Sequence, residues 1–470
     1  MRPILFVNGS VLTIIGLPLI LIEMLNEGAE APFLEAFACI MFFGIGFILV
    51  SRGAEMSFSR KQLFILTVSV WVTLTAAATL PFWLWGIPLT DAVFEAASGI
   101  TTTGATVLSN LDDMPHSILM WRAFLQWLGG IGIVVMAIAI LPFLKIGGMQ
   151  LFQTESSERT DDELPSAAKL ASVTIWVYLA MTILCIAAFL IGGMSLFDAV
   201  AHTFATVSTG GFSTHDQSFG YFDSDFVKWS CVVFMFAGSV PFIWYIRAVR
   251  KGQFASEQLW VYGAGLLIVI ASVAIWLVME RQESVADASL LAAFSVVSVV
   301  TTSGFAIEDY SGWSGFSALF FFLLIMTGGC TGSTSGGIKV MRFVVSGKMI
   351  RQIISRSVFP SGVFTAKYEG KVISGEVFGS VAGFMFIYMV TFLFFAFILA
   401  LSGLDLMTSL SGSAAALANE GAGIGPIIGP SGNYGSLTSF VKWALAFEMI
   451  LGRLEIFTLL VFLTPRFWRS

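Results

Sequence analysis

Ten long apolar runs dominate the sequence and decide what it can fold into. Each is long enough to cross the ~30 Å hydrocarbon core of a bilayer as a helix rising ~1.5 Å per residue. With 57% hydrophobic and 11% charged residues, the chain has too little polar surface to cover a soluble globule. The sequence therefore predicts an all-α polytopic membrane protein. The runs lie near 3–25, 33–50, 63–86, 118–144, 170–193, 226–246, 259–279, 316–345, 372–402 and 437–462.

The basic residues orient these predicted helices. If Arg2 lies in the cytoplasm and the chain crosses ten times, most of the 24 Lys and Arg residues fall on the cytoplasmic side. Cytoplasmic loops of membrane proteins are rich in such residues. We therefore expect both termini in the cytoplasm, with the first apolar run retained because no cleavage site follows it.

Four short apolar runs, each followed by a glycine-centred loop, repeat between the long runs. They are too short to span a membrane, so each predicts a half-helix that enters from outside and returns as an irregular loop. Asp91 and Asp198 open the first two at positions suited to helix N-caps. The short runs cover 91–100, 197–206, 287–300 and 405–418, and their loops read TTTGATV (101–107), VSTGGFS (207–213), VTTSGFA (300–306) and ANEGAGI (418–424).

Four such loops in matching topology predict a ring around a cation pathway. The half-helices aim the negative ends of their dipoles at the centre, and backbone carbonyls can replace the water around a large monovalent cation. Glycine permits the required backbone angles, and the Thr and Ser hydroxyls that precede it in the first three loops can hydrogen-bond behind the loop. We expect ion selection at the backbone of residues 101–104, 207–210, 301–304 and 418–421.

A second unusual segment interrupts the run at 316–345. Residues 327–337, TGGCTGSTSGG, are consecutive helix breakers, and the segment lacks the GK[ST] of a phosphate-binding loop. A flexible polar loop beneath a selective ring indicates a gate. The alternative is a seam of small residues where two helices pack.

Arg453 lies within an apolar helix and therefore needs a partner. Glu448 and Glu455 are rotated ~140° to 160° away from it around the helix. We expect the carbonyls of 327–337 to accept its hydrogen bonds, so that Arg453 latches the loop shut while Lys339 sets the charge on the cytoplasmic side. In the alternative interpretation, Arg453 stabilises the bundle without a role in gating.

The four loops, GGMQLFQTES at 147–156, TGGCTGSTSGGIK at 327–339 and GRLEIFT at 452–458 resemble the TrkH and KtrB family of potassium uptake proteins. The resemblance covers essentially the whole chain, and the extra helix pair before residue 60 is more similar to TrkH. It implies a potassium filter at Thr102, Thr103, Gly104, Ser208, Thr209, Gly210, Thr302, Ser303, Gly304, Asn419, Glu420 and Gly421. It implies a gate at Gly328, Gly329, Cys330, Thr331, Gly332, Ser333, Gly336, Gly337, Lys339 and Arg453.

The resemblance also implies four helix, pore-loop, helix repeats around one pathway. The expected divisions are an N-terminal helix pair (1–60), repeat one (61–145), a cytoplasmic loop (146–169), repeat two (170–257), repeat three (258–371) and repeat four (372–470).

The same resemblance implies a homodimer in a bacterial cytoplasmic membrane, with a cytosolic TrkA-like regulatory subunit that binds ATP/ADP or NAD/NADH. No cofactor is expected in this chain, potassium is its substrate, and no nucleic acid is involved. Segments 145–169 and 346–371 are the expected docking surface for the regulatory subunit.

The fourth loop departs from the family pattern of an Asn, an apolar residue and Gly-Pro-Gly. Here Glu420 precedes Gly421, and Ala422 replaces the proline. An ionised carboxylate would raise cation occupancy, whereas burial would favour its neutral form. In a further interpretation, Glu420 points behind the filter and pairs with another helix.

Other functions have weaker support. The three histidines are scattered, and the sequence contains no HExxH, nucleophile elbow or Walker motif, so we expect no enzyme. His202 fits hydrogen-bonded packing. A transporter that couples potassium to protons or another ion, or one that carries sodium, remains an alternative. The pairs Trp121–Arg122, Lys228–Trp229 and Lys442–Trp443 suggest an interfacial belt.

Overall fold

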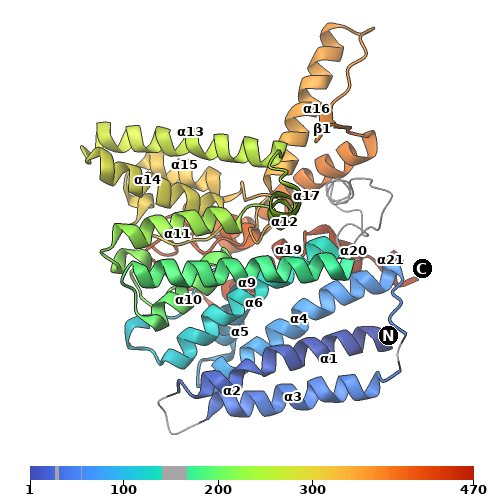
Figure 1. The fold of residues 1–470 in the computed structure, drawn as a ribbon, viewed down its shortest axis with the longest axis vertical. Helices are drawn as coiled ribbons and strands as arrows, with labels where there is room; N and C mark the ends of the chain where they lie inside the picture. The colour runs from blue at the N-terminus through green and yellow to red at the C-terminus, as the bar shows by residue number, and fades with distance from the viewer. Residues whose placement is uncertain (27–30, 54, 140–166, 470) are drawn as a thin grey trace.

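The computed structural model describes residues 1–26, 31–53, 55–139 and 167–469, and these form a bundle of helices (Figure 1). Within these described residues, seven helices are long and apolar enough to cross a membrane, or eight if one bent pair counts as a single span. Many of their side chains face outward, such as Phe42 at 75% exposed and Phe386 at 71%. Lipid is the natural environment for such a surface. The predicted all-α polytopic fold is confirmed, and both chain ends lie at the same end of the bundle.

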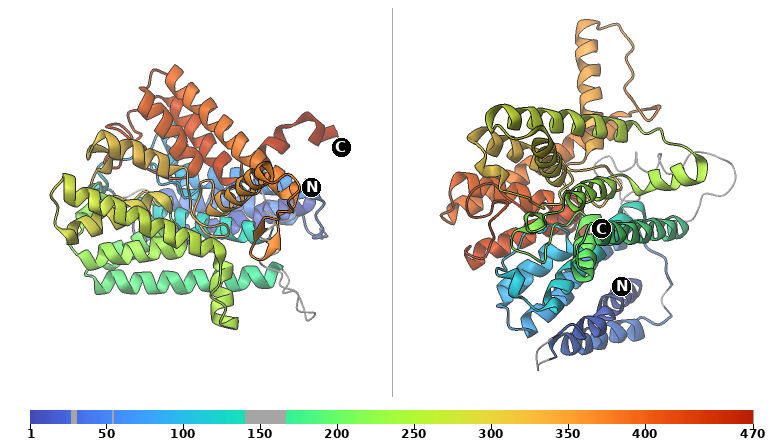
Figure 2. Two further views of the ribbon diagram at one scale, coloured as in Figure 1. Left: turned by 90° about the horizontal axis from the view of Figure 1, so that it is seen from above. Right: turned by 60° about the vertical axis from the view of Figure 1, so that its left-hand side comes forward.

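Three N-terminal helices pack at one edge of the molecule, as Figures 1 and 2 show from three directions. Gly9 and Gly44 allow the first and third helices to touch, because a methyl group added to Gly9 would lie 2.7 Å from the Gly44 carbonyl oxygen. The Asn8 amide donates to the Ser69 hydroxyl at 3.0 Å and ties this group to the next helix. The three helices are α1 (Arg2–Gly16), α2 (Pro18–Glu23) and α3 (Pro32–Val50).

The rest of the described chain repeats one pattern four times: a long helix, a short helix ending in a loop, and a second long or broken helix. The first copy contains α4 (Arg60–Leu84), α5 (Leu89–Ile100), η1 (Leu111–Asp113) and α6 (His116–Ala139). The second contains α9 (Ala167–Ile191), α10 (Leu196–Val207), η2 (Ser218–Tyr221), α11 (Asp225–Gly238) and α12 (Phe242–Lys251).

The third and fourth copies follow the same order. The third contains α13 (Glu257–Glu280), α14 (Val285–Val300), η3 (Tyr310–Gly312), α15 (Gly315–Ile325) and α16 (Val340–Val358). The fourth contains α17 (Gly375–Leu401), α18 (Leu406–Ala418), α19 (Ser439–Arg453), α20 (Phe457–Leu463) and α21 (Pro465–Arg469).

In the part of the chain that the structure describes, three of the predicted spans are broken helices. The chain bends by 89° between α11 and α12, next to Pro241, which has no amide hydrogen to continue a helix. The predicted interruption at 327–337 separates α15 from α16. The last span breaks after α19, where Glu455 and Ile456 have positive φ values of 58° and 40°. The end of the run 118–144 and the motif at 147–156 lie outside the described residues.

The predicted N-caps at Asp91 and Asp198 are wrong, because both helices begin earlier. The Ser195 hydroxyl caps α10 by accepting from the amide of Asp198 at 3.1 Å. α5 starts directly after Pro88, which has no side chain able to cap it. Asp405 does cap α18, through a 3.0 Å bond from the Thr408 amide.

The helix α16 projects from the bundle, and a short antiparallel hairpin follows it (Figure 1). The hairpin strands are β1 (Lys367–Tyr368) and β2 (Lys371–Val372), with Tyr368 opposite Lys371. The Tyr368 hydroxyl donates to the Gln258 amide oxygen at 3.0 Å, which anchors the hairpin on α13. The projection therefore has a fixed base and an exposed far end.

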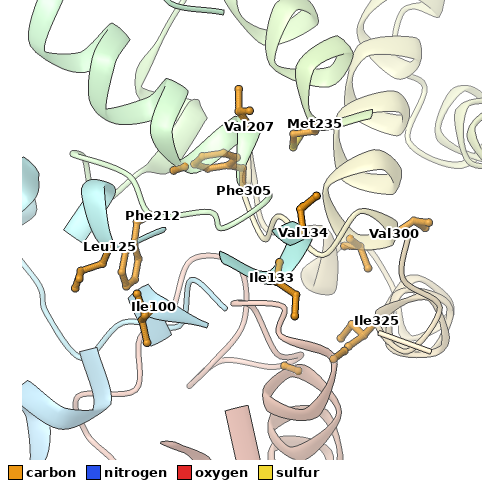
Figure 3. Close-up of a cluster of buried hydrophobic side chains, with 14 of the residues drawn as sticks. Ile100, Leu125, Ile133, Val134, Val207, Phe212, Met235, Val300, Phe305 and Ile325 are labelled. Carbon is orange, nitrogen blue, oxygen red and sulfur yellow. The ribbon is translucent and has the colours of Figure 1, made fainter. Parts of the chain in front are cut away.

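Buried apolar side chains from all four copies surround the returning loops at the centre of the bundle. Figure 3 shows Ile100, Leu125 and Phe212 gathered beside the first two loops, with Val300 and Ile325 on the other side of the cluster. This packing excludes lipid from the irregular backbone of the loops, which a membrane protein requires.

The contact between α1 and α3 yields a test of the fold. We expect Gly9→Val to lower the free energy of unfolding by about 1–3 kcal/mol, because the added methyl groups collide with the α3 backbone. The matched control is Gly46→Val on α3, where an added methyl group would meet nothing within 4 Å. Thermal unfolding in detergent measures both variants, and equal midpoints would contradict the packing argument.

Candidate functional site

All four short helices end in the same turn, which fixes how their loops correspond. In each, an amide donates to the carbonyl five residues earlier, and the residue before that amide is left-handed; this is the Schellman pattern of helix termini. The amides are those of Thr103, Gly210, Ser303 and Glu420, with bonds of 2.8, 2.8, 2.8 and 2.9 Å. The left-handed residues are Thr102, Thr209, Thr302 and Asn419, with φ values of 55°, 52°, 59° and 55°.

This correspondence shifts the second loop by one residue relative to the sequence prediction. Gly211, and not Gly210, occupies the position of Gly104 and Gly304, with a φ of 83° beside their 88° and 77°. Gly210 instead corresponds to Thr103 and Ser303. The sequence alone could not choose between two adjacent glycines. Ser208 accordingly matches Thr101, one residue before the left-handed position.

The left-handed threonines are strained. A β-branched residue rarely has positive φ, and such a conformation costs of the order of 1–3 kcal/mol. Three of the four loops contain a threonine at this position, and each is at most 1% exposed. Strain of this kind persists only where surrounding structure imposes it, and it concentrates at functional sites.

The four loops touch one another in cyclic order and form a closed ring. A methyl group on Gly104 would lie 2.1 Å from the Gly210 oxygen, and one on Gly211 would lie 1.8 Å from the Ser303 oxygen. A methyl group on Gly304 would approach the Gly421 amide at 3.0 Å, and one on Gly421 would approach the Gly104 carbonyl carbon at 2.6 Å. Backbone therefore packs directly on backbone around the whole ring.

A cavity of about 70 Å³ opens over this ring. All four corresponding glycines line it: Gly104, Gly211, Gly304 and Gly421. Residues that follow the ring in the first, second and fourth loops complete the wall, together with Arg122. The ring thus has a small polar mouth on the side of the bundle opposite to the chain ends.

A buried ion pair holds the first two loops beside this mouth. The Arg122 Nε atom lies 2.7 Å from a Glu95 carboxylate oxygen, and neither side chain is more than 1% exposed. Arg122 also donates to the Ser213 carbonyl at 2.9 Å and to the Thr106 hydroxyl at 3.1 Å. One guanidinium thus connects α5, α6 and both loops.

The predicted interfacial belt is wrong for several of its members. Arg122 and Trp121 are buried, and the Trp121 indole donates to the Ala78 carbonyl at 3.1 Å. Lys442 is 6% exposed and pairs with Asp91 at 2.7 Å. Only the sequence partners Trp229 and Trp443 keep large exposed surfaces, at 41% and 47%.

The fourth loop is held differently from the other three. The Asn419 amide donates to the Thr103 hydroxyl at 3.1 Å and to the Met449 carbonyl at 2.8 Å. The Tyr434 hydroxyl donates to the Gly421 carbonyl at 3.1 Å. The Glu420 carboxyl is fully buried, and within the described ranges neither of its oxygens has a hydrogen-bond partner. The interpretation that Glu420 pairs with another helix therefore finds no support.

The predicted gate segment lies directly under the ring and is bonded to three short helices. The Gly336 amide donates to the Thr302 hydroxyl at 2.8 Å, and the Gly337 amide to the Ala418 carbonyl at 2.9 Å. The Thr334 hydroxyl lies 3.2 Å from that of Thr209. A methyl group on Gly336 would come within 2.0 Å of the Ala418 oxygen. The segment therefore leaves little space below the ring. The other predicted gate residues Gly328, Gly329, Cys330, Thr331, Gly332 and Ser333 are also buried.

Arg453 reaches this segment from α19. Its side chain is 3% exposed and donates to the Thr334 carbonyl at 3.0 Å. Glu448 does not serve as its partner, and instead accepts from the Ser413 hydroxyl at 2.7 Å. The contact is the one expected of a latch between α19 and the segment.

Sequence reasoning missed the importance of Glu455. It pairs with Lys339 at 3.1 Å and with Arg342 at 2.5 Å, and all three side chains are at most 5% exposed. Lys339 ends the gate segment, whereas Arg342 lies in the first turn of α16 and stacks 3.6 Å from the Phe384 ring centre. The signal available was a second ionisable residue within the apolar run 437–462, two positions after Arg453.

Two outer loops meet at a histidine and two aspartates. The His215 ring lies 2.5 Å from Asp112 and 3.5 Å from Asp198. Burial alone would lower the pKa of His215, but hydrogen bonds and charge from the two aspartates outweigh this effect and raise it. The ring of His202 also makes two hydrogen bonds, one with the backbone carbonyl of Asp198 at 2.9 Å and one with the Ser213 hydroxyl at 3.0 Å. These bonds agree with the predicted role of His202 in packing.

The His215 contact predicts a pH-dependent stability. The folded state binds the proton on His215 more tightly than the unfolded state does. The resulting stabilisation of the folded state is therefore complete below the ordinary histidine pKa of about 6.5. It is lost as the pH rises through the raised value. We expect the difference in thermal midpoint between the wild type and His215→Gln to be largest near pH ~5.5 and to shrink by pH ~8.5. A difference that stays constant over this range would contradict the assignment.

A ring of four corresponding loops inside a bundle of apolar helices defines a polytopic membrane protein with fourfold internal repetition. The TrkH family model, described as "Cation transport protein", matches residues 31–470. The chain belongs to this family.

Its relatives match along nearly their whole lengths. The Trk system potassium uptake protein TrkI of Halomonas elongata is 41% identical, over 97% of this chain and 94% of its own. The TrkH protein of Escherichia coli is 34% identical, over 95% of this chain and 94% of its own. The crystal structure of the potassium transporter TrkH from Vibrio parahaemolyticus superposes with a TM-score of 0.91 at 34% identity, covering 100% of this chain and 99% of that one.

Proposed function

We propose that this protein takes up potassium ions across a bacterial cytoplasmic membrane through the ring of four loops. The observation that supports this most directly is the closed backbone ring, in which four short helices end at corresponding left-handed residues. The names of the relatives, which are potassium uptake proteins, agree with it.

The ring can provide oxygen ligands to a cation in place of water. The C-terminal ends of four helices converge on one place, and each contributes the negative end of its dipole. Carbonyl oxygens are weak, numerous ligands that can replace a hydration shell without trapping the ion. The filter we propose contains residues 102–104, 209–211, 302–304 and 419–421, with Ser208 behind it.

The segment 327–339 is the proposed gate. Its hydrogen bonds to the ends of α10, α14 and α18, and the close approach of Gly336 to the Ala418 carbonyl, support a closed pathway in this conformation. Arg453 is the proposed latch, since it holds the Thr334 carbonyl from α19. Lys339 joins the end of the segment to Glu455.

Regulation would enter from the side of the chain ends, which we assign to the cytoplasm. The projecting helix α16 begins next to the gate, and its far part exposes Ile350, Ile354 and Val358 at 56%, 58% and 63%. We propose this projection, within segment 346–371, as a contact for a cytosolic nucleotide-binding subunit and the protein itself as a homodimer. The other expected docking segment, 145–169, lies mostly outside the described residues. The nucleotide would belong to the subunit and not to this chain.

Liposome flux measurements test the function. We expect rubidium and potassium to enter far faster than sodium, since the filter replaces hydration only for an ion of matching size and field strength. The purified protein is reconstituted, and uptake is followed with and without an imposed pH gradient. Equal rates for sodium and potassium would contradict a selective filter. An absolute requirement for the proton gradient would favour the alternative, a proton-coupled symporter.

Removing the latch tests the gate. We expect Arg453→Ala to raise basal rubidium flux roughly tenfold or more, because a hydrogen bond from a charged donor stabilises the closed loop by about 1.5–3 kcal/mol. Arg281→Ala is the matched control, since Arg281 is a partly exposed arginine that pairs with Glu308 away from the pathway. Rubidium flux is measured for both variants in liposomes of the same composition. Unchanged flux in Arg453→Ala would contradict the latch and leave Arg453 a bundle-stabilising residue.

A further inference from the structure

The side chain of Gln126 holds both sides of the second loop. Its amide nitrogen donates to the Gly210 carbonyl at 2.6 Å, and its amide oxygen accepts from the Phe212 backbone at 3.0 Å. Gln126 is fully buried on α6, which belongs to the first repeat. A single side chain from a neighbouring repeat thus fixes the two peptide groups that flank Gly211.

The second loop lacks the brace found in two of the others. In the first loop the hydroxyls of Thr101 and Thr103 pair at 2.7 Å. In the third loop those of Thr301 and Ser303 pair at 2.8 Å. These residues stand on either side of the strained left-handed position, so each pair stiffens the turn. In the second loop the corresponding positions hold Ser208 and Gly210, and a glycine has no hydroxyl to offer.

Ser208 is otherwise placed like its counterpart. Its hydroxyl donates to the Phe204 carbonyl at 2.7 Å, just as the Thr101 hydroxyl donates to the Ala97 carbonyl at 2.7 Å. Only the second member of the hydroxyl pair is missing. At the braced position, the second loop therefore differs from the first and third in Gly210 and in the side chain that contacts it.

Gly210 and Gln126 fit each other in volume. A methyl group on Gly210 would lie 2.5 Å from the Gln126 amide carbon and 2.7 Å from its oxygen. A hydroxyl-bearing residue at this position would have to displace the glutamine amide. The internal hydroxyl pair and the external amide are mutually exclusive braces.

We propose that Gln126 is a positioning residue for ion selection, which braces the second loop from outside in place of the hydroxyl pair of the first and third loops. This inference rests on the proposed function of the ring as a potassium filter. The Gly210 carbonyl that Gln126 holds is also the atom that Gly104 approaches, so the amide fixes the joint between the first two loops. Because selection depends on the placement of a few carbonyl dipoles, loss of this brace changes ion preference before it changes the fold.

The first experiment compares two buried glutamines. Gln126→Met keeps the length of the side chain and removes both hydrogen bonds, and we expect the potassium-to-sodium flux ratio in liposomes to fall about tenfold. Gln258→Met is the matched control, because Gln258 is 1% exposed and bonds Tyr368 away from the ring. We expect its flux ratio to equal that of the wild type. Thermal midpoints measured with potassium or sodium separate loss of selection from loss of folding. We expect potassium to stabilise the wild type more than sodium does, and we expect this difference to disappear in Gln126→Met.

The second experiment exchanges one brace for the other. Gly210→Ser alone collides with the Gln126 amide, and we expect it to lose selectivity. In the double variant Gly210→Ser with Gln126→Ala, the amide is gone and the introduced hydroxyl can pair with Ser208. We expect this double variant to recover a potassium-to-sodium ratio higher than that of Gly210→Ser or Gln126→Met.

The outcomes separate this inference from the function on which it rests. A wild-type protein that does not prefer potassium overturns the proposed filter itself. A selective wild type whose ratio survives Gln126→Met overturns only the role of Gln126. A double variant whose potassium-to-sodium ratio is no higher than that of Gly210→Ser also overturns the role of Gln126. This comparison remains decisive if Gln126→Met fails to fold.

Discussion

Direct packing of backbone on backbone around the ring is the constraint on which the rest of the structure depends. Gly104, Gly211 and Gly421 each face a neighbouring peptide group at a distance that leaves no room for a side chain. Four loops can approach this closely only if every helix that delivers them ends at the same depth and in the same turn. The common Schellman geometry meets this requirement, and the repetition in the sequence follows from it.

Buried polar groups surround the ring because backbone at this depth has no water to bond. Arg122 with Glu95 secures the first two loops, whereas Asn419 and Tyr434 secure the fourth. A buried ion pair contributes little net stability, yet removing one partner leaves an uncompensated charge and is costly. These side chains therefore specify one arrangement of the loops, while the apolar contacts shown in Figure 3 supply the burial.

Much of this design was readable from the sequence. Apolar run lengths predicted the all-α membrane fold, and four short apolar runs, each followed by a glycine-centred loop, predicted four returning loops. The sequence could not choose between Gly210 and Gly211, since either permits a positive φ, and only the hydrogen bond from Gly210 to Ala205 decides it. Nor could it show that Arg122 is buried, because a basic residue beside a tryptophan also fits a membrane interface. Contacts between distant segments, such as Gln126 with Phe212, leave no local pattern.

The bonds between the left-handed threonines and the segment 327–339 have a consequence for energetics. Thr209 and Thr302 belong to the ring, yet their hydroxyls meet Thr334 and the Gly336 amide below it. Any displacement of that segment removes hydrogen-bond partners from two strained residues. The free energy of the ring geometry therefore depends on the position of the segment. Thermodynamic linkage then makes the effect reciprocal: an ion that binds one ring geometry better also favours the segment position that accompanies it. Ion occupancy of the ring and displacement of the segment 327–339 would thus shift the same equilibrium.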